Sequence, residues 1–133
     1  ASPHWAAELD GITIELKKIV EPKTKNNIVI EGAGGVYVPL NDKDVVMDLI
    51  QKDYKAIVVS RHYLGSINHT LLTYELLKAR HIPMAGIVFN GPSNASGETF
   101  ILNHTGLKVL LRVPELANLD PNIIQEYAEH IQL

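Results

Sequence analysis

Ile28-Val29-Ile30-Glu31-Gly32-Ala33-Gly34-Gly35 is a short β-branched run that ends at a carboxylate and a cluster of glycines. A run that is apolar along its whole length and bounded by glycine predicts a buried strand over residues 27–30. A carboxylate directly after such a strand suits Mg²⁺, because hard cations take oxygen ligands and share them with phosphates. The glycines allow backbone N–H groups to approach an anion closely. A solvated acid before a plain turn explains these residues equally well.

Three more apolar runs follow this stretch, at residues 56–60, 85–89 and 108–111. Each is short and fully apolar or nearly so, and each stops at polar, glycine or proline residues, so each predicts a buried strand. Helical patterns separate the runs. Strand and helix therefore alternate four times, which predicts an α/β fold with a doubly wound, mostly parallel sheet and helices on both faces.

Helices are predicted around Val45 to Ile50 and at about residues 66–80 and 98–104, with a last one that begins at Asp120-Pro121, a cap followed by proline. Asn41 or Asp42 is expected to cap the first, and Ser66 the second. Residues 5–20 predict two short helical pieces, and residues 21–26 predict a polar connector. The expected inward faces are Val45, Val46, Leu49 and Ile50; Ile67, Leu71, Leu72, Leu76 and Ala79; and Ile123, Ile124, Tyr127, Ala128 and Ile131.

The composition narrows the class of protein. A length of 133 residues suits a single domain over 1–133. The formal net charge of -3 provides no basic field for nucleic acid and no polybasic membrane patch. No apolar run approaches the roughly 20 residues that span a bilayer, and the absence of cysteine excludes disulfides and thiolate metal sites. These features fit a cytoplasmic enzyme that binds neither nucleic acid nor membrane.

Polar residues stand at the carboxyl ends of all four predicted strands, where parallel sheets bind their ligands. They are Glu31 with its glycines, Ser60-Arg61-His62, Asn90-Gly91 and Pro114-Glu115. The Asn90 amide has both donors and acceptors, which suits a purine edge; a turn-forming Asn before Gly91 explains it as well. The residues from Pro114 to Leu116 predict a loop wall against a base, or simply a connection to the last helix.

Gly65-Ser66-Ile67-Asn68 opens the second predicted helix. Unpaired N–H groups and the helix dipole make such a terminus suitable for an anion, although an ordinary helix cap is the simpler interpretation. His62 and Arg61 face either a ligand or water. His69 is expected to pack or to form hydrogen bonds in the first turn and is assigned no catalysis.

At these residues the sequence resembles the dethiobiotin synthetases. Residues 29–40 are similar to their "VEGAGG…PL" segment, and residues 60–73 to their "LGxINHxLLT" segment. The strand that ends in Asn90, the loop at Val113-Pro114-Glu115-Leu116 and the opening Ser2-Pro3-His4 also resemble segments of that family. The resemblance covers essentially the whole chain.

The resemblance implies an ATP- and Mg²⁺-dependent cyclo-ligase of biotin synthesis with a P-loop NTPase-like fold. Such an enzyme forms dethiobiotin from 7,8-diaminopelargonic acid and CO2. The residues implied to bind Mg²⁺, phosphates or adenine are Glu31 as the metal ligand, the backbone of Gly32, Ala33 and Gly34, and Asn90, Gly91, Pro114, Glu115 and Leu116. Those implied to bind the substrate carboxylate are Ser66, Ile67 and Asn68. A homodimer is implied too.

The chain departs from the family in three respects: it contains no GxxxxGK[ST] phosphate loop, and it lacks the family's catalytic lysine and a second metal-binding acid. In the family those residues precede the Ser-Pro-His segment. The chain is therefore expected to be a C-terminal portion, incomplete at the N-terminus, with no catalytic residue of its own and no ATP turnover alone. A non-catalytic nucleotide-binding or regulatory domain of the same fold is the alternative, and a purely structural α/β module is a third.

Overall fold

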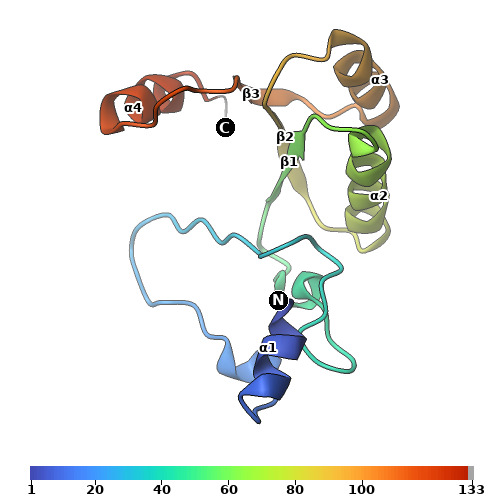
Figure 1. The fold of residues 1–133 in the computed structure, drawn as a ribbon, viewed down its shortest axis with the longest axis vertical. Helices are drawn as coiled ribbons and strands as arrows, with labels where there is room; N and C mark the ends of the chain where they lie inside the picture. The colour runs from blue at the N-terminus through green and yellow to red at the C-terminus, as the bar shows by residue number, and fades with distance from the viewer. Residues whose placement is uncertain (132–133) are drawn as a thin grey trace. The chain divides into compact units, whose positions relative to one another are not determined.

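A parallel sheet of three strands forms at the three later apolar runs. The computed structural model describes residues 1–131. Strands β1 (Ala56–Arg61), β2 (Met84–Asn90) and β3 (Val109–Val113) lie in the order β1-β2-β3, and both neighbouring pairs are parallel (Figure 1). The predicted α/β class with a parallel sheet is confirmed, and so are these three strands.

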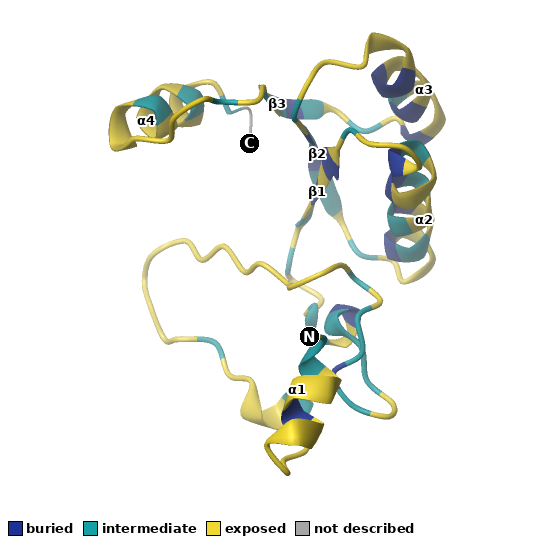
Figure 2. Cartoon of the chain, viewed as in Figure 1, coloured by how far each residue is buried: buried dark blue, intermediate teal, exposed yellow. Residues whose placement is uncertain are grey.

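Helices α2 (Ser66–Ala79) and α3 (Ala95–Thr105) connect the strands in sequence. Because both crossovers join neighbouring parallel strands, right-handed connections place both helices on one side of the sheet, with α4 (Pro121–Glu129) on the other (Figure 1). The side chains buried between sheet and helices include Val58, Tyr74, Leu77, Ile87, Phe89, Ile101 and Leu110. Figure 2 shows this burial along the inner sides of α2 and α3.

The chain divides into two compact units, Ala1–Lys52 and Asp53–Leu133. The first contains α1 (Pro3–Leu9) and the 3₁₀ helices η1 (Leu16–Lys18) and η2 (Val46–Leu49), and it buries Ala7, Leu40 and Met47. The two helical pieces and the polar connector expected before residue 27 are confirmed. A single domain over residues 1–133 stays a prediction.

The strand predicted at residues 27–30 is wrong. These residues have no strand conformation, and the whole stretch 22–35 is exposed, with Val29 91% exposed (Figure 2). A strand exists through ladder hydrogen bonds to a neighbour, and the sheet of the described residues contains only β1, β2 and β3. The β-branched composition is therefore present without the pairing that a strand requires.

The helix predicted around Val45 to Ile50, with Asn41 or Asp42 as its cap, is only a short 3₁₀ helix, and the predicted cap is wrong. Asn41 Oδ1 accepts hydrogen bonds from the N–H groups of Lys43 and Asp44, both 2.9 Å long. This turn leads into an antiparallel bridge between Pro39 and Val45, so the helical turn begins only at Val46, as η2. Asn41 stabilises a turn before the bridge and does not cap a helix.

Helix α2 has the predicted length but buries a different face. Its buried residues are Ser66, Thr70, Tyr74 and Leu77, whereas Leu72 is 60% exposed. The cap is Gly65, in a left-handed conformation with φ +94°, and Ser66 is the first helical residue, so the predicted Ser66 cap is wrong. The buried face carries hydroxyl groups because Thr70 Oγ1 and Ser60 Oγ of β1 lie 2.7 Å apart and satisfy each other.

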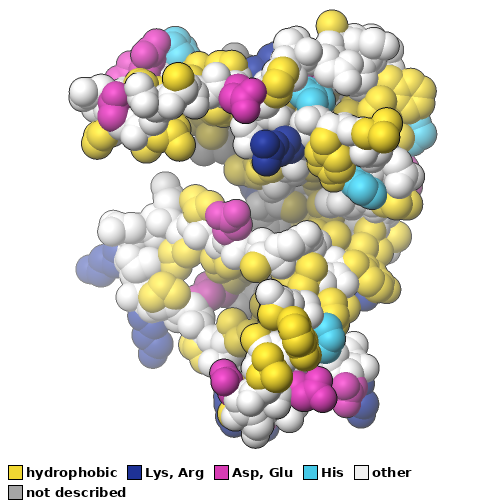
Figure 3. Space-filling model, viewed as in Figure 1, with side chains coloured by type: hydrophobic (Ala, Val, Ile, Leu, Met, Phe, Trp, Pro, Cys, Tyr) yellow, Lys and Arg dark blue, Asp and Glu magenta, His cyan; other side chains and the backbone are white. Residues whose placement is uncertain are grey.

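Asp120 caps α4 as predicted, because its Oδ1 accepts hydrogen bonds from the N–H groups of Asn122 and Ile123. The predicted face is correct only in part: Ile123, Tyr127 and Ile131 are half-buried, whereas Ile124 and Ala128 are exposed. Helix α3 includes the expected residues, ends at Thr105 and is capped by Gly106, which has φ +68°. Figure 3 shows hydrophobic side chains on the outer surface over α2 and α3, where Leu72 and Phe100 are more than half exposed.

Candidate functional site

The carboxyl ends of β1, β2 and β3 meet at one edge of the sheet. In the ladder, Arg61 is the partner of Asn90, and Asn90 is the partner of Val113. The N–H of Gly91 donates a 2.8 Å hydrogen bond to the Val113 carbonyl, and the N–H of His62 donates to the Asn90 carbonyl at 3.3 Å. Three of the four predicted strand ends are therefore joined by backbone bonds.

The residues proposed to hold adenine follow directly from this edge. Asn90 and the loop residues Pro114 and Glu115 are exposed, while Gly91 and Leu116 are half-buried. Gly91 has φ +106°, a conformation that L side chains rarely adopt. The ladder brings Asn90 next to Val113, and therefore next to the start of the Pro114 loop. An exposed amide beside a proline loop is a suitable surface for a flat heterocycle.

The start of α2 borders a groove at the same edge. The groove is lined by residues 62–68 of the β1–α2 connection and residues 92–95 before α3. The Ser66 N–H already donates a 3.0 Å hydrogen bond to the Tyr63 carbonyl, and the Ser66 side chain is buried. The N–H groups of Ile67 and Asn68 belong to the first turn, where a helix supplies no acceptor of its own. They are the better candidates for an anion.

A cluster of polar side chains lies beneath this edge, on the α3 side of the sheet. Glu98 of α3 bonds to His62 after β1 (Nε2 to Oε1, 3.1 Å) and to Arg112 of β3 (Nε to Oε2, 2.7 Å). The Glu98 and His62 side chains are only 6% and 7% exposed. The His62 ring stacks on Phe89 with centroids 5.5 Å apart, and the Arg112 guanidinium lies 5.6 Å from the same ring. His62 therefore packs inside the fold and does not face open solvent.

The Glu98 carboxylate is ionised in this environment. Burial on its own raises the pKa of Glu98, but the hydrogen bonds from Arg112 and His62, with one from the Asn94 backbone, outweigh it, so the pKa lies below the ordinary 4.5. An ionised carboxylate only accepts hydrogen bonds. Nε2 of His62 must therefore carry the proton that it donates to Glu98.

Sequence reasoning missed Glu98 and Arg112. Glu98 reads as an ordinary acid in the first turn of a helix, and Arg112 as a charge near the end of a strand. The only local signal is that Arg112 interrupts an apolar run, Val109-Leu110-Leu111-Arg112-Val113, at the position paired with Phe89. The hydrogen bond between Glu98 and Arg112 depends on how the crossover places α3 against β3, and no local sequence pattern contains that information.

Glu31 and the residues Gly32, Ala33 and Gly34 belong to the first unit, in an exposed segment without regular structure. Gly34 has φ +90°, and a Cβ on Gly32 would lie 2.6 Å from a Val46 methyl carbon, so both positions favour glycine. Within residues 1–131 no group of three or more His, Cys, Asp or Glu side chains forms a metal-binding cluster. Glu31 would supply one oxygen to a cation that keeps its water and phosphate ligands, which is the usual behaviour of Mg²⁺.

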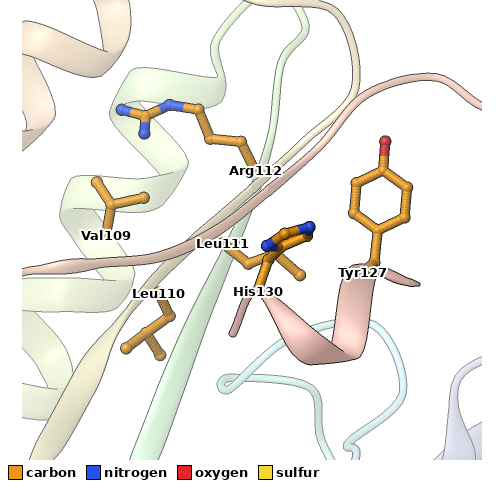
Figure 4. Close-up of a pocket in the computed structure, with 6 residues that line it drawn as sticks. All are labelled: Val109, Leu110, Leu111, Arg112, Tyr127 and His130. Carbon is orange, nitrogen blue, oxygen red and sulfur yellow. The ribbon is translucent and has the colours of Figure 1, made fainter. Parts of the chain in front are cut away.

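A second hollow lies between β3 and α4 and is shown in Figure 4. Leu111 and His130 lie close to each other there, Tyr127 stands beside them, and Arg112 points away toward the other side of the strand. None of the residues predicted to bind nucleotide or substrate lines it. Among the described residues, no helix is long and apolar enough to cross a membrane.

The fold defines a class of protein. The model of the AAA domain family matches residues 1–122, and the chain belongs to this family. Its parallel α/β sheet is the core expected of a P-loop NTPase-like fold.

Among curated proteins, the chain is similar to the ATP-dependent dethiobiotin synthetases BioD. It is 51% identical over 128 residues to the protein of Christiangramia forsetii, and 55% identical over 129 residues to that of Cytophaga hutchinsonii. Each match covers 96% of this chain but only 62% and 63% of the relative. The protein of Brucella anthropi is 38% identical over 135 residues, with 64% of its length covered. The chain therefore spans less than two thirds of the length of these relatives.

Proposed function

We propose that this chain is part of an ATP- and Mg²⁺-dependent dethiobiotin synthetase. The enzyme would form dethiobiotin from 7,8-diaminopelargonic acid and CO2, in biotin biosynthesis. The observation that carries the proposal is the identity of 51% and 55% to proteins of that name over 96% of the chain. The joined carboxyl ends of β1, β2 and β3 support it, because a nucleotide binds at that edge in open α/β sheets.

The chemistry asks the protein for positioning and for charge stabilisation. One amine of the diamine takes up CO2 to give a carbamate, which ATP phosphorylates with release of ADP. The second amine then attacks the carbamoyl carbon and expels phosphate, which closes the cyclic urea. None of these steps needs a covalent link to the protein, so bound phosphates, a cation and oriented N–H groups are suitable parts.

At the nucleotide, Asn90 would bond the edge of adenine, and Gly91 with the loop Pro114–Leu116 would bound the ring. Asn90 offers both a donor and an acceptor, which matches a purine edge. The positive φ of Gly91 turns the chain away directly after Asn90, so the amide stands at the rim of the sheet.

At the phosphates, Glu31 would supply one oxygen ligand to Mg²⁺, and the backbone N–H groups of Gly32, Ala33 and Gly34 would face the anion. When bound, Mg²⁺ offsets the negative charge of the phosphates. The exposure of residues 22–35 leaves this carboxylate and these N–H groups accessible.

At the diamine's far carboxylate, Ile67 and Asn68 would donate N–H groups at the start of α2, with Ser66 beside them. The helix dipole favours a negative charge at this end. A homodimer, in which α2 of one subunit serves the site of the other, and a cytoplasmic location are parts of the same proposal. The dimer rests on the family resemblance, and the location rests on the composition of the chain.

The test compares the full-length gene product with the 133-residue chain. Each is incubated with Mg²⁺, ATP, bicarbonate and 7,8-diaminopelargonic acid, and dethiobiotin and ADP are measured by mass spectrometry. The expected result is one ADP per dethiobiotin from the full-length product and no turnover by the chain alone. A full-length product that binds ATP without forming dethiobiotin would support a non-catalytic nucleotide-binding domain instead. Turnover by the isolated chain would contradict the need for a phosphate loop.

A further inference from the structure

Glu98 connects the two outer strands of the sheet at their carboxyl ends. One carboxylate oxygen accepts a hydrogen bond from Nε2 of His62, which directly follows β1, and the other accepts one from Nε of Arg112 in β3. Phe89 of β2 lies against both partners, with the His62 ring stacked on it and the Arg112 guanidinium near its face. One side chain from a helix thus spans all three strands through two bonds and a shared aromatic ring.

Backbone bonds join this network to the edge where the nucleotide is proposed to bind. The N–H of His62 donates to the Asn90 carbonyl, and Phe89 directly precedes Asn90. Arg112 directly precedes Val113, whose carbonyl accepts the Gly91 N–H. Both of these backbone bonds at the Asn90-Gly91 turn therefore involve a residue that is in the network or next to it.

We propose that Glu98 is a positioning residue for the nucleotide site: by holding His62 and Arg112, it fixes the ends of β1 and β3 around the Asn90-Gly91 turn. This proposal rests on the proposed function, in which the Asn90-Gly91 turn binds adenine. Glu98 itself contacts no ligand. It acts through the backbone of His62 and Arg112.

Burial strengthens the hydrogen bonds to Glu98. Two charge-assisted hydrogen bonds to a carboxylate that is 6% exposed are worth more than the same bonds in water. The charged and titratable groups that face Glu98 are Arg112 from β3 and His62 from the β1–α2 connection, and both donate to it. The backbone of Asn94, the cap of α3, also bonds with Glu98, so α3 itself is anchored at this point.

The experiment uses the full-length gene product with Glu98→Gln. Glutamine keeps the shape but removes the charge and one acceptor oxygen. A second variant, Arg112→Gln, changes a side chain that is 55% exposed and leaves the bond between Glu98 and His62 intact, so it serves if Glu98→Gln does not fold. The control is Glu75→Gln, a half-exposed acid of α2 whose Oε1 lies 3.7 Å from His104 Nε2.

Two readouts are combined. Hydrogen exchange is measured at the amides of His62 and Gly91, and at Ile87, whose N–H bonds to the Lys108 carbonyl in the body of the sheet. Binding of Mg²⁺-ATP is measured by calorimetry. In Glu98→Gln we expect exchange at His62 and Gly91 to accelerate more than exchange at Ile87. Binding of ATP should become about tenfold weaker, which corresponds to the loss of one hydrogen bond to a charged group. Arg112→Gln should weaken binding to a smaller extent, and Glu75→Gln should change neither readout.

Unchanged exchange at His62 and Gly91 in Glu98→Gln would overturn the proposal. So would faster exchange at these two amides with unchanged ATP binding, because the network would then hold the edge without serving the nucleotide. Equal acceleration at Ile87 would mean general destabilisation and would also contradict it. If the unaltered protein does not bind ATP, the proposed function fails, whereas the exchange measurement still decides whether Glu98 holds the strand ends.

Discussion

The hydroxyl oxygens of Ser60 and Thr70 lie 2.7 Å apart in the buried interface between β1 and α2. Ser60 is 2% exposed and Thr70 is 6% exposed, so the hydrogen bond between the two hydroxyls lies inside the interface. This bond explains why α2 buries a face with hydroxyl groups and leaves Leu72 in solvent. It also aligns the start of α2 with the end of β1, and therefore the candidate anion site with the sheet edge.

Replacing Ser60 by Ala is expected to lower the free energy of unfolding by about 1–3 kcal/mol, because the Thr70 hydroxyl loses its partner inside the interface. The measurement is urea unfolding of the full-length protein. The double variant Ser60→Ala with Thr70→Val removes both polar groups and is expected to recover part of the loss. A double variant as unstable as the sum of the two single variants would contradict the hydrogen bond.

Gly86 lies in the middle of β2 where β3 approaches closely. A Cβ at this position would lie 2.5 Å from the Lys108 carbonyl oxygen and 2.8 Å from Leu110 Cγ, with φ at +154°. Gly86→Ala must therefore push β3 away, and we expect a loss of several kcal/mol, on the order of 3 or more, or an insoluble protein. Gly106→Asn is the matched control: its φ of +68° suits asparagine and nothing lies within 4 Å, so it should cost little. Equal stability of both variants would refute the close contact.

Glu98 gives stability a defined dependence on pH. Its pKa in the fold lies below the ordinary 4.5, so its contribution is fully present above about pH 4.5 and is lost as the pH falls through the lower folded value. Unfolding measured between pH 7 and pH 3 should show stability that decreases on the acid side. Glu98→Gln should be less stable at pH 7 and should show a shallower decrease below pH 4.5. A decrease identical to that of the unaltered protein would mean that another carboxylate causes it.

The sequence predicted correctly those parts of the fold that depend on residues close together in the chain. The apolar run of β1 ends at Arg61-His62, that of β2 at Asn90, and that of β3 before Pro114. Helix α4 begins at Asp120-Pro121, as expected. The incorrect predictions share one cause: in each case the structure depends on contacts with residues far away in the chain. Residues 27–30 have strand composition but no neighbouring strand among the described residues, and the buried face of α2 is set by Ser60.

The same limit applies to the site. The meeting of three strand ends followed from the parallel order alone. The network beneath them did not, because Glu98, His62 and Arg112 come from three segments that only the crossovers bring together. The roles of Glu31, Asn90 and the start of α2 remain predictions, and substitutions of Asn90 and Glu31 can test the roles of these two residues.

Asn90→Asp is expected to weaken ATP binding by about tenfold, because a carboxylate cannot donate a hydrogen bond to a purine ring nitrogen. The measurement is calorimetric binding of Mg²⁺-ATP to the full-length protein. Asn103→Asp, at an exposed position in α3, is the control for added negative charge. If both substitutions weaken ATP binding equally, the added negative charge explains the effect, and Asn90 does not bind adenine.

Glu31→Gln tests the carboxylate after the glycine-rich segment. If Glu31 ligates Mg²⁺, the neutral amide should raise the Mg²⁺ concentration that gives half-maximal dethiobiotin formation by roughly tenfold, since a hard cation prefers a charged oxygen ligand. Excess Mg²⁺ should then restore much of the rate, which a folding defect would not allow. Glu8→Gln in α1, also an exposed acid of the first unit, serves as the control and should leave the Mg²⁺ dependence unchanged. An unchanged Mg²⁺ dependence in Glu31→Gln would make this residue a solvated acid before a turn, since a ligand of the metal cannot lose its charge without altering the affinity.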